Sequence, residues 1–193
     1  MENKKNIDLP TALQLEQELK ILRYRRNFMS TLRSTVASLI VVASIAMIIS
    51  TMLMPVLRVT GTSMTPTLQN DEVILCSKLS DYKKGDIVAF YYNNKVLLKR
   101  VIGVAGDVID ITQDGTVFVN GQKLDEPYVS ELALGECDIE LPYQVPDNRI
   151  FVMGDHRSVS IDSRSTSVGC IAEENVIGRV FMEVWPFDQF GHL

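Results

Sequence analysis

The chain has 193 residues, of which 46% are hydrophobic and 22% are charged. This composition excludes a disordered or low-complexity protein, and the length suffices for one or two domains of roughly 100 to 150 residues. The net charge of −5 is unevenly divided, because residues 1–33 carry seven Lys or Arg and four acids, whereas residues 58–193 carry twelve basic and twenty acidic side chains. The larger part therefore offers no basic face for nucleic acid.

Three cysteines, Cys76, Cys137 and Cys170, are too few and too scattered for a disulfide framework or a four-ligand zinc site. We expect them to be buried thiols, at least one of them free. We expect no metal and no cofactor.

Residues 12–26 read ALQLEQELKILRYRR, with Leu15, Leu19 and Leu22 at positions i, i+4 and i+7. This spacing predicts a short amphipathic helix within an N-terminal segment, residues 1–33. A coiled-coil partner requires three or more heptads, so we expect the helix to lie unpartnered in solvent or on a membrane surface.

Residues 34–57, STVASLIVVASIAMIISTMLMPVL, contain no charged side chain and exceed the ~20 residues that a helix needs to cross a bilayer. They predict a permanent transmembrane anchor. A cleaved signal peptide fits less well, because its leader is short, although small residues stand at Ser44 and Ala46. A buried core helix is a further alternative, and an interfacial helix needs a polar face that this stretch lacks.

The charges that flank this stretch predict its orientation in a cell membrane. Four Arg lie within the eleven residues before it, whereas Arg58 is followed by no Lys or Arg until Lys78. By the positive-inside rule, residues 1–33 are cytoplasmic and residues 58–193 form an extracytoplasmic domain. Ser63 follows Arg58 by five residues, so a site there lies within ~17 Å of chain from the membrane surface.

Beyond the anchor the sequence is typical of short strands joined by tight turns. Asn93-Asn94, Asp114-Gly115 and Asn120-Gly121 separate several of the runs, and an Asn-Gly step supplies the two positive-φ residues of a type I′ hairpin. The acidic segment 125–147 lacks periodicity and is expected to be a long loop. We therefore predict a mostly β body with an antiparallel, sheet- or barrel-like architecture. Its strands are expected at residues 72–76, 86–92, 95–104, 108–112, 117–119, 149–153 and 176–185.

The first candidate for a nucleophile is Ser63, in the segment Gly61-Thr62-Ser63-Met64-Thr65-Pro66-Thr67-Leu68. Gly61 permits an unusual backbone and the close approach of a substrate chain, and Pro66 fixes its own φ. An ordinary turn serine has the same pattern. A catalytic serine also needs a base that accepts its proton.

Two histidines and one lysine are the candidates for that base. His192 is next to the last residue and is expected to be exposed, which leaves His156. Lys99 is an isolated cation in an apolar run, where burial favours the neutral amine. Strand alternation places Lys99 and Arg100 on opposite faces, so one of the two is expected to face the interior. A lysine that snorkels to solvent is the alternative.

A third segment, residues 153–164, follows an apolar strand and contains two acids, two arginines and three serines. A surface loop has the same composition. Alternatively, Asp162 and Arg164 pair and order the loop, which leaves Ser160 to orient a lysine amine.

Together these segments resemble the type I signal peptidases, the membrane-bound Ser/Lys endopeptidases that remove signal peptides from exported proteins. The likeness covers nearly all of residues 35–185, and the single span and compact length are similar to the short form found in Gram-positive bacteria. It rests on the anchor and on the motifs Ser63-Met64-x-Pro66-Thr67-Leu68, Lys84-Gly85-Asp86-Ile87-Val88, Lys99-Arg100-Val101-Ile102-Gly103, Gly106-Asp107, Val119-Asn120-Gly121, Gly154-Asp155-x-Arg157 and Asp162-Ser163-Arg164.

The resemblance implies two catalytic residues and three residues that support them. Ser63 matches the nucleophile, with its backbone N–H as oxyanion donor, and Lys99 matches the general base and acid. Ser160 matches the hydroxyl that helps to position the lysine. Asp162 and Arg164 match the pair that supports the site.

Two positions depart from the pattern of this family. Gly61 stands where some members carry a second, oxyanion-binding hydroxyl, so the source of that donor is open. His156 replaces the usual Asn and preserves a polar side chain.

The resemblance also implies how a substrate binds. In the family an extended signal-peptide segment lies alongside the strand before the nucleophile and the strand that carries the lysine, with shallow pockets for small residues at positions −3 and −1. These pockets imply cleavage after Ala-x-Ala-like sequences, with preprotein signal peptides and the lipid bilayer as partners. The expected apolar walls, for which core packing is the alternative, are Leu57, Val59, Met64, Leu68 and Leu98.

Three other functions fit parts of the sequence. A self-cleaving Ser/Lys autoprotease of the SOS-repressor type shares the catalytic pair, but such proteins carry a DNA-binding domain and no membrane span. A non-catalytic, anchored β module that binds exported polypeptides predicts an ordinary pKa for Lys99. A Ser/His/Asp hydrolase uses His156 as its base.

Overall fold

The computed structural model describes residues 11–79, 81–186 and 191–192, and the chain divides into two units, residues 1–50 and 51–193. One long helix, α1 (Ala12–Leu53), occupies most of the first unit, and none of its residues is buried. Within the described ranges, α1 is the one helix that is long and apolar enough to cross a membrane, by length and composition. The predicted amphipathic helix and the predicted anchor are therefore parts of one continuous helix.

Helix α1 ends at Leu53, before the end of the stretch predicted to span the membrane. Pro55 explains this end, because a proline disfavours helical backbone at the residue before it and offers no N–H to the helix. Val56 and Leu57 belong instead to strand β1 (Val56–Arg58), which pairs with β2. The last four residues of the predicted span are thus not helical.

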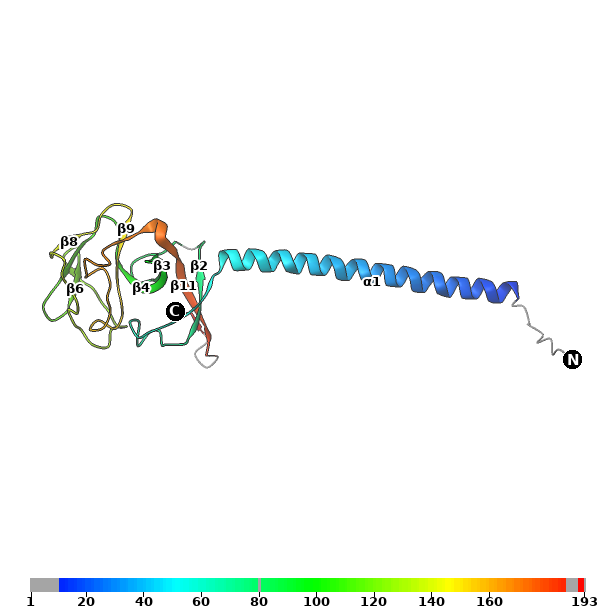
Figure 1. The fold of residues 1–193 in the computed structure, drawn as a ribbon, viewed down its shortest axis with the longest axis horizontal. Coiled ribbons are helices and arrows are strands. Elements are labelled where there is room, and N and C mark those ends of the chain that lie inside the picture. The colour runs from blue at the N-terminus through cyan, green and yellow to red at the C-terminus, as the bar shows by residue number, and fades with distance from the viewer. Residues whose placement is uncertain (1–10, 80, 187–190, 193) are drawn as a thin grey trace. The chain divides into compact units, whose positions relative to one another are not determined.

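Two antiparallel sheets build the second unit (Figure 1). The larger has the order β1-β2-β11-β3-β4-β9-β10, with β12 paired to β11, and the smaller has the order β7-β6-β5-β8. The prediction of a mostly β, antiparallel body is confirmed. Beyond β1, its elements are β2 (Val73–Ser77), β3 (Ile87–Tyr92), β4 (Lys95–Gly103), β5 (Val108–Ile111), β6 (Val117–Val119), β7 (Gln122–Lys123), β8 (Tyr143–Gln144), β9 (Arg149–Met153), β10 (Ile171–Ala172), η1 (Glu173–Asn175), β11 (Val176–Trp185) and β12 (Gly191–His192).

Two of the predicted turns have the backbone that a type I′ hairpin requires. Asn93 and Asn94, between β3 and β4, have φ of 45° and 60°, and Asn120 and Gly121, between β6 and β7, have φ of 53° and 75°. The two-residue strands β7, β8, β10 and β12 were not predicted from the pattern, because two residues carry no periodicity. Strand β1 was not predicted from it either, because Val56 and Leu57 continue the uncharged apolar stretch.

Strand β4 lies inside the larger sheet, between β3 and β9, and both of its adjacent cations are buried. Lys99 is 4% exposed and Arg100 is 8% exposed. Alternation accounts for one inward cation, but the other face of β4 is covered too. There the Arg100 guanidinium donates from Nε to Asp155 Oδ1 at 2.9 Å and stacks 3.8 Å from the centre of the Tyr128 ring. A carboxylate partner and an aromatic cover thus make the second burial possible.

Candidate active site

Ser63 lies in the loop that connects β1 to β2. The two ends of this loop are held together, because the Asp71 N–H donates to the Val59 carbonyl at 2.9 Å and the Gly61 N–H donates to Asn70 Oδ1 at 2.8 Å. Gly61 has φ of +91°, which favours glycine over other residues. Gly61 therefore permits the backbone conformation before Ser63, and these hydrogen bonds stabilise it.

Two apolar side chains anchor the same loop on the other side of Ser63. Met64 is 2% exposed and Leu68 is 0% exposed, both within the apolar core of this part of the body. The Ser63 carbonyl in turn accepts the N–H of His156 at 3.1 Å. Ser63 itself is half-buried, so its hydroxyl stands at the edge of a fixed loop.

Lys99 contacts Ser63 directly. The Lys99 Nζ and Ser63 Oγ atoms are 2.7 Å apart, with the amine as donor in this arrangement. The two residues are 36 positions apart in the sequence and come together because β4 passes beside the loop that carries Ser63.

The surroundings of Lys99 lower the pKa of its amine from the ordinary value of 10.5. Burial is the main cause, because it penalises the ammonium form. The Arg164 cation lowers the pKa further, whereas the Asp162 and Asp155 carboxylates oppose the shift. A neutral amine in hydrogen-bond contact with a serine hydroxyl can accept its proton. The lowered pKa of Lys99 differs from the ordinary pKa that a non-catalytic binding module predicts for this residue.

Ser160 packs against Gly154, beside which the Ser63 carbonyl also lies, and the missing side chain of Gly154 makes this approach possible. A Cβ atom at Gly154 would lie 2.2 Å from Ser160 Oγ and 2.5 Å from the Ser63 carbonyl oxygen, so no larger residue fits there. Ser160 is 2% exposed, and its hydroxyl has no hydrogen-bond partner within the described part of the chain.

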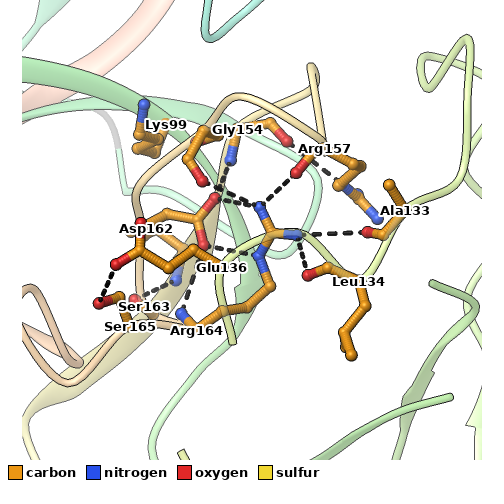
Figure 2. A network of polar contacts seen from close by, with 12 residues as sticks. Lys99, Ala133, Leu134, Glu136, Gly154, Arg157, Asp162, Ser163, Arg164 and Ser165 are labelled. Carbon is orange, nitrogen blue, oxygen red and sulfur yellow. Dashed lines mark hydrogen bonds and ion pairs between the residues drawn. The ribbon is translucent and has the colours of Figure 1, made fainter. Parts of the chain in front are cut away.

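Asp162 and Arg164 form the ion pair that the sequence predicts, and neither side chain is exposed. Arg164 Nε donates to Asp162 Oδ1 at 2.8 Å, and Asp162 Oδ2 also accepts the Gly154 N–H at 2.9 Å. Figure 2 shows the Arg164 guanidinium in the middle of a ring of acceptors that includes the carbonyls of Leu134 and Arg157. The pair thus fixes the loop that carries Ser160.

The acidic segment 125–147 is held against this site by two arginines. Arg164 reaches the Leu134 carbonyl at 2.6 Å, and Arg157 donates from Nη1 to Glu126 Oε2 at 3.0 Å. Arg157 and Glu126 are 0% and 4% exposed at their side chains. Sequence reasoning placed a loop here but did not identify its partners. The sequence does contain a signal for one of them, because Arg157 is a charge that stands four residues after the apolar strand β9.

A groove lies beside Ser63 and Lys99 and brings together most of the predicted substrate-binding residues. Leu57, Val59, Met64 and Leu98 line it. Leu68 does not, which corrects the prediction: its side chain is fully buried in the core and offers no surface to a substrate. The lining residues that the prediction did not include are Arg58, Thr60, Gly61, Val96 and Leu97.

His156 does not form a Ser/His/Asp arrangement with Ser63. Its Nδ1 atom lies 3.0 Å from Thr65 Oγ1, and the adjacent Asp155 binds Arg100 and Thr67. The backbone of His192 lies in β12, but its side chain is outside what the structure describes, so the exposure predicted for it is not tested.

The described residues hold neither a disulfide nor a metal-binding group. All three cysteines are free, with Cys76 and Cys170 buried and Cys137 half-buried. No cluster of three or more His, Cys, Asp or Glu suited to a metal ion occurs in the described ranges.

Comparison with known proteins agrees with the resemblance drawn from the motifs. The model of the family "Signal peptidase, peptidase S26" matches residues 32–185. A signal peptidase IB from Staphylococcus aureus is 36% identical over 152 residues, which are 68% of this chain and 78% of that protein. A signal peptidase I from Bacillus licheniformis is 34% identical over 176 residues, which are 84% of this chain and 94% of that protein. A crystal structure of a signal peptidase I from Enterococcus faecalis is 27% identical, with a TM-score of 0.43, and covers 53% of this chain and 98% of its own. The chain therefore belongs to the signal peptidase family, peptidase S26.

Proposed function

We propose that this protein is a membrane-anchored serine endopeptidase that removes signal peptides from exported preproteins. Family membership gives the class of reaction. The observation that carries the proposal for this chain is the 2.7 Å contact between Lys99 Nζ and Ser63 Oγ, at an amine whose pKa burial lowers. A base of this kind is what a serine nucleophile requires.

In the proposed mechanism Ser63 and Lys99 form a catalytic dyad. Ser63 Oγ attacks the scissile carbonyl carbon while its proton passes to Lys99 Nζ. The resulting ammonium returns the proton to the leaving amine as the carbon–nitrogen bond breaks. Water then hydrolyses the acyl-enzyme, with Lys99 again as the base that accepts a proton.

The developing oxyanion needs a donor beside Ser63. The Ser63 backbone N–H is suited to this role, because it donates to no acceptor within the described part of the chain. Gly61 has no side chain that could add a second donor. In this mechanism Ser160 helps to position the Lys99 amine, a role for which its buried hydroxyl, unpartnered within the described ranges, is available. Asp162 and Arg164 act on the amine through their charges.

The groove supports an extended substrate chain. Residues 95–98 of β4 pair with β3 on one side, while β4 meets β9 only from Arg100 onward. On the other side of the groove, β1 pairs with β2 alone among the described strands. Two open strand edges beside Ser63 can both bond a peptide backbone. The apolar side chains of the groove lining, among them Leu57, Val59 and Leu98, support a preference for small apolar residues at positions −3 and −1 of Ala-x-Ala-like sites.

Cleavage of a preprotein by the full-length, detergent-solubilised protein tests this function. We expect a single cut directly after a small-x-small sequence, identified by mass spectrometry of both products. A preprotein in which the −1 residue is replaced by a large aromatic residue serves as the matched control and is expected to stay intact. The proposal is contradicted if the unaltered preprotein is not cleaved, or if it is cut at unrelated sites.

We also propose that residues 1–33 are cytoplasmic and that the body is extracytoplasmic, on the basis of the flanking charges and the apolar character of α1. Protease added to intact cells is therefore expected to reach the body and to spare the N-terminal segment, detected by tags at the two ends of the chain. Digestion of the N-terminal segment in intact cells contradicts this topology.

A further inference from the structure

His156, which the proposed mechanism does not use, contacts the nucleophile loop on both sides of Ser63. Its Nδ1 atom lies 3.0 Å from Thr65 Oγ1 and 3.3 Å from the Thr62 carbonyl oxygen. The Thr65 hydroxyl in turn donates to the same Thr62 carbonyl at 2.8 Å. One imidazole nitrogen thus meets the residue before Ser63 and the second residue after it.

The acceptors around His156 Nδ1 favour one direction for its bond to Thr65 Oγ1. The Thr65 hydroxyl has one hydrogen, and the Thr62 carbonyl, which can only accept, receives it. Nδ1 must then carry a hydrogen to bond Thr65 Oγ1, so we assign the neutral ring the tautomer protonated at Nδ1. The protonated ring presents the same N–H. His156 is accordingly a hydrogen-bond donor to this loop in either state.

The backbone of His156 extends the connection to the rest of the site. Its N–H donates to the Ser63 carbonyl at 3.1 Å, and its carbonyl accepts the Ser160 N–H at 3.1 Å. Any residue other than proline preserves these two bonds. The side chain contributes separately, through the donor at Nδ1, and substitution can therefore isolate its effect.

We propose that His156 is a positioning residue, whose Nδ1–H holds the Thr62–Thr65 backbone so that Ser63 Oγ stays in contact with Lys99 Nζ. This inference rests on the proposed function and adds a residue to it. The 2.7 Å contact on which proton transfer depends is short, and small displacements of a reacting atom lower the rate steeply. His156 does not touch Ser63 Oγ, so it acts through the loop.

Two variants of similar size separate a donor from a space-filling role. His156→Asn keeps an N–H donor near the position of Nδ1, whereas His156→Leu fills the space and donates nothing. We expect His156→Leu to lower kcat about tenfold with KM little changed, and His156→Asn to recover most of the loss. Ser158→Ala, an exposed position in the same loop, is the control and is expected to match the wild type.

The partner of the contact provides a second test. Thr65→Val removes the hydroxyl that His156 meets, and it is expected to lower kcat by a similar factor. The double variant His156→Leu/Thr65→Val is expected to be no slower than the slower single variant, because both changes break the same connection. Purified full-length proteins are compared on one preprotein, after thermal unfolding has shown that each variant is folded.

The outcomes are distinct. A folded His156→Leu enzyme with wild-type kcat, equal losses in the Leu and Asn variants, or losses that multiply in the double variant overturn the positioning role. If Ser63→Ala cleaves as fast as the wild type, the proposed function itself fails. If Ser63→Ala is inactive while His156→Leu is fully active, only the role of His156 fails.

Discussion

Replacement of Ser63 by alanine is expected to abolish preprotein cleavage, with a loss of about 10³-fold or more in rate. The change removes the atom that attacks the scissile carbonyl and leaves the Lys99 amine without the hydroxyl it contacts at 2.7 Å. The body is expected to stay folded, because the anchors of the loop are the buried Met64 and Leu68 rather than the half-buried Ser63. Product formation is followed on one preprotein, and folding is followed by circular dichroism on heating.

Ser158→Ala is the matched control for this experiment. Ser158 is exposed, lies in the loop that follows β9, and makes no hydrogen bond within the described part of the chain. It is expected to cleave at the wild-type rate. Turnover by a folded Ser63→Ala enzyme within a few-fold of this control rejects Ser63 as the nucleophile.

Replacement of Lys99 by arginine is expected to be as damaging as the loss of Ser63. A guanidinium keeps the positive charge but does not deprotonate at any accessible pH, so it cannot accept the Ser63 proton. Arginine is larger than lysine, and the site is buried, so the arginine variant can fail to fold. Lys99→Met is therefore the second variant, because methionine is similar in size to lysine but has no amine. Both are expected to be inactive, and His156→Asn is expected to retain substantial activity.

The pH dependence of the wild type follows from the same amine. Because the pKa of Lys99 lies below the ordinary 10.5, kcat/KM is expected to rise with pH as the ammonium deprotonates, with a midpoint below that value. The profile is measured from about pH 6 to about pH 10 and is expected to have the same basic side in His156→Asn. An active Lys99→Arg enzyme together with an inactive His156→Asn enzyme overturns the dyad in favour of His156.

The pH dependence of the free energy of unfolding tests the lowered pKa of Lys99 independently of activity. Between its folded-state pKa and 10.5 the unfolded chain binds more protons than the folded one, so the free energy of unfolding is expected to rise with pH in this window. Lys99→Met lacks this contribution. A wild type and a Lys99→Met variant with the same pH dependence of unfolding would show that the amine is not perturbed.

Local pattern was enough to predict much of the fold. The uncharged stretch, the β-branched runs and the Asn-containing turns act over a few residues, where side-chain period and backbone preference decide the structure. The motifs around Ser63, Lys99 and Ser160 also indicated the site, because a nucleophile, a base and a supporting hydroxyl are recognisable by residue type. The ends of elements were less predictable, as the helix that stops at Leu53 shows.

The sequence alone therefore determined that a β body follows an apolar helix along the chain. It also determined the residues on which the chemistry is proposed to depend. Only the tertiary structure decided which charges far apart in the sequence meet: Arg100 pairs with Asp155 across 55 positions, and Arg157 pairs with Glu126 across 31. It also buries Leu68 in the core and brings His156, from the loop after β9, into contact with the loop that carries Ser63. The reason is that such contacts depend on how strands and loops far apart in the sequence pack together, and no local period records that arrangement.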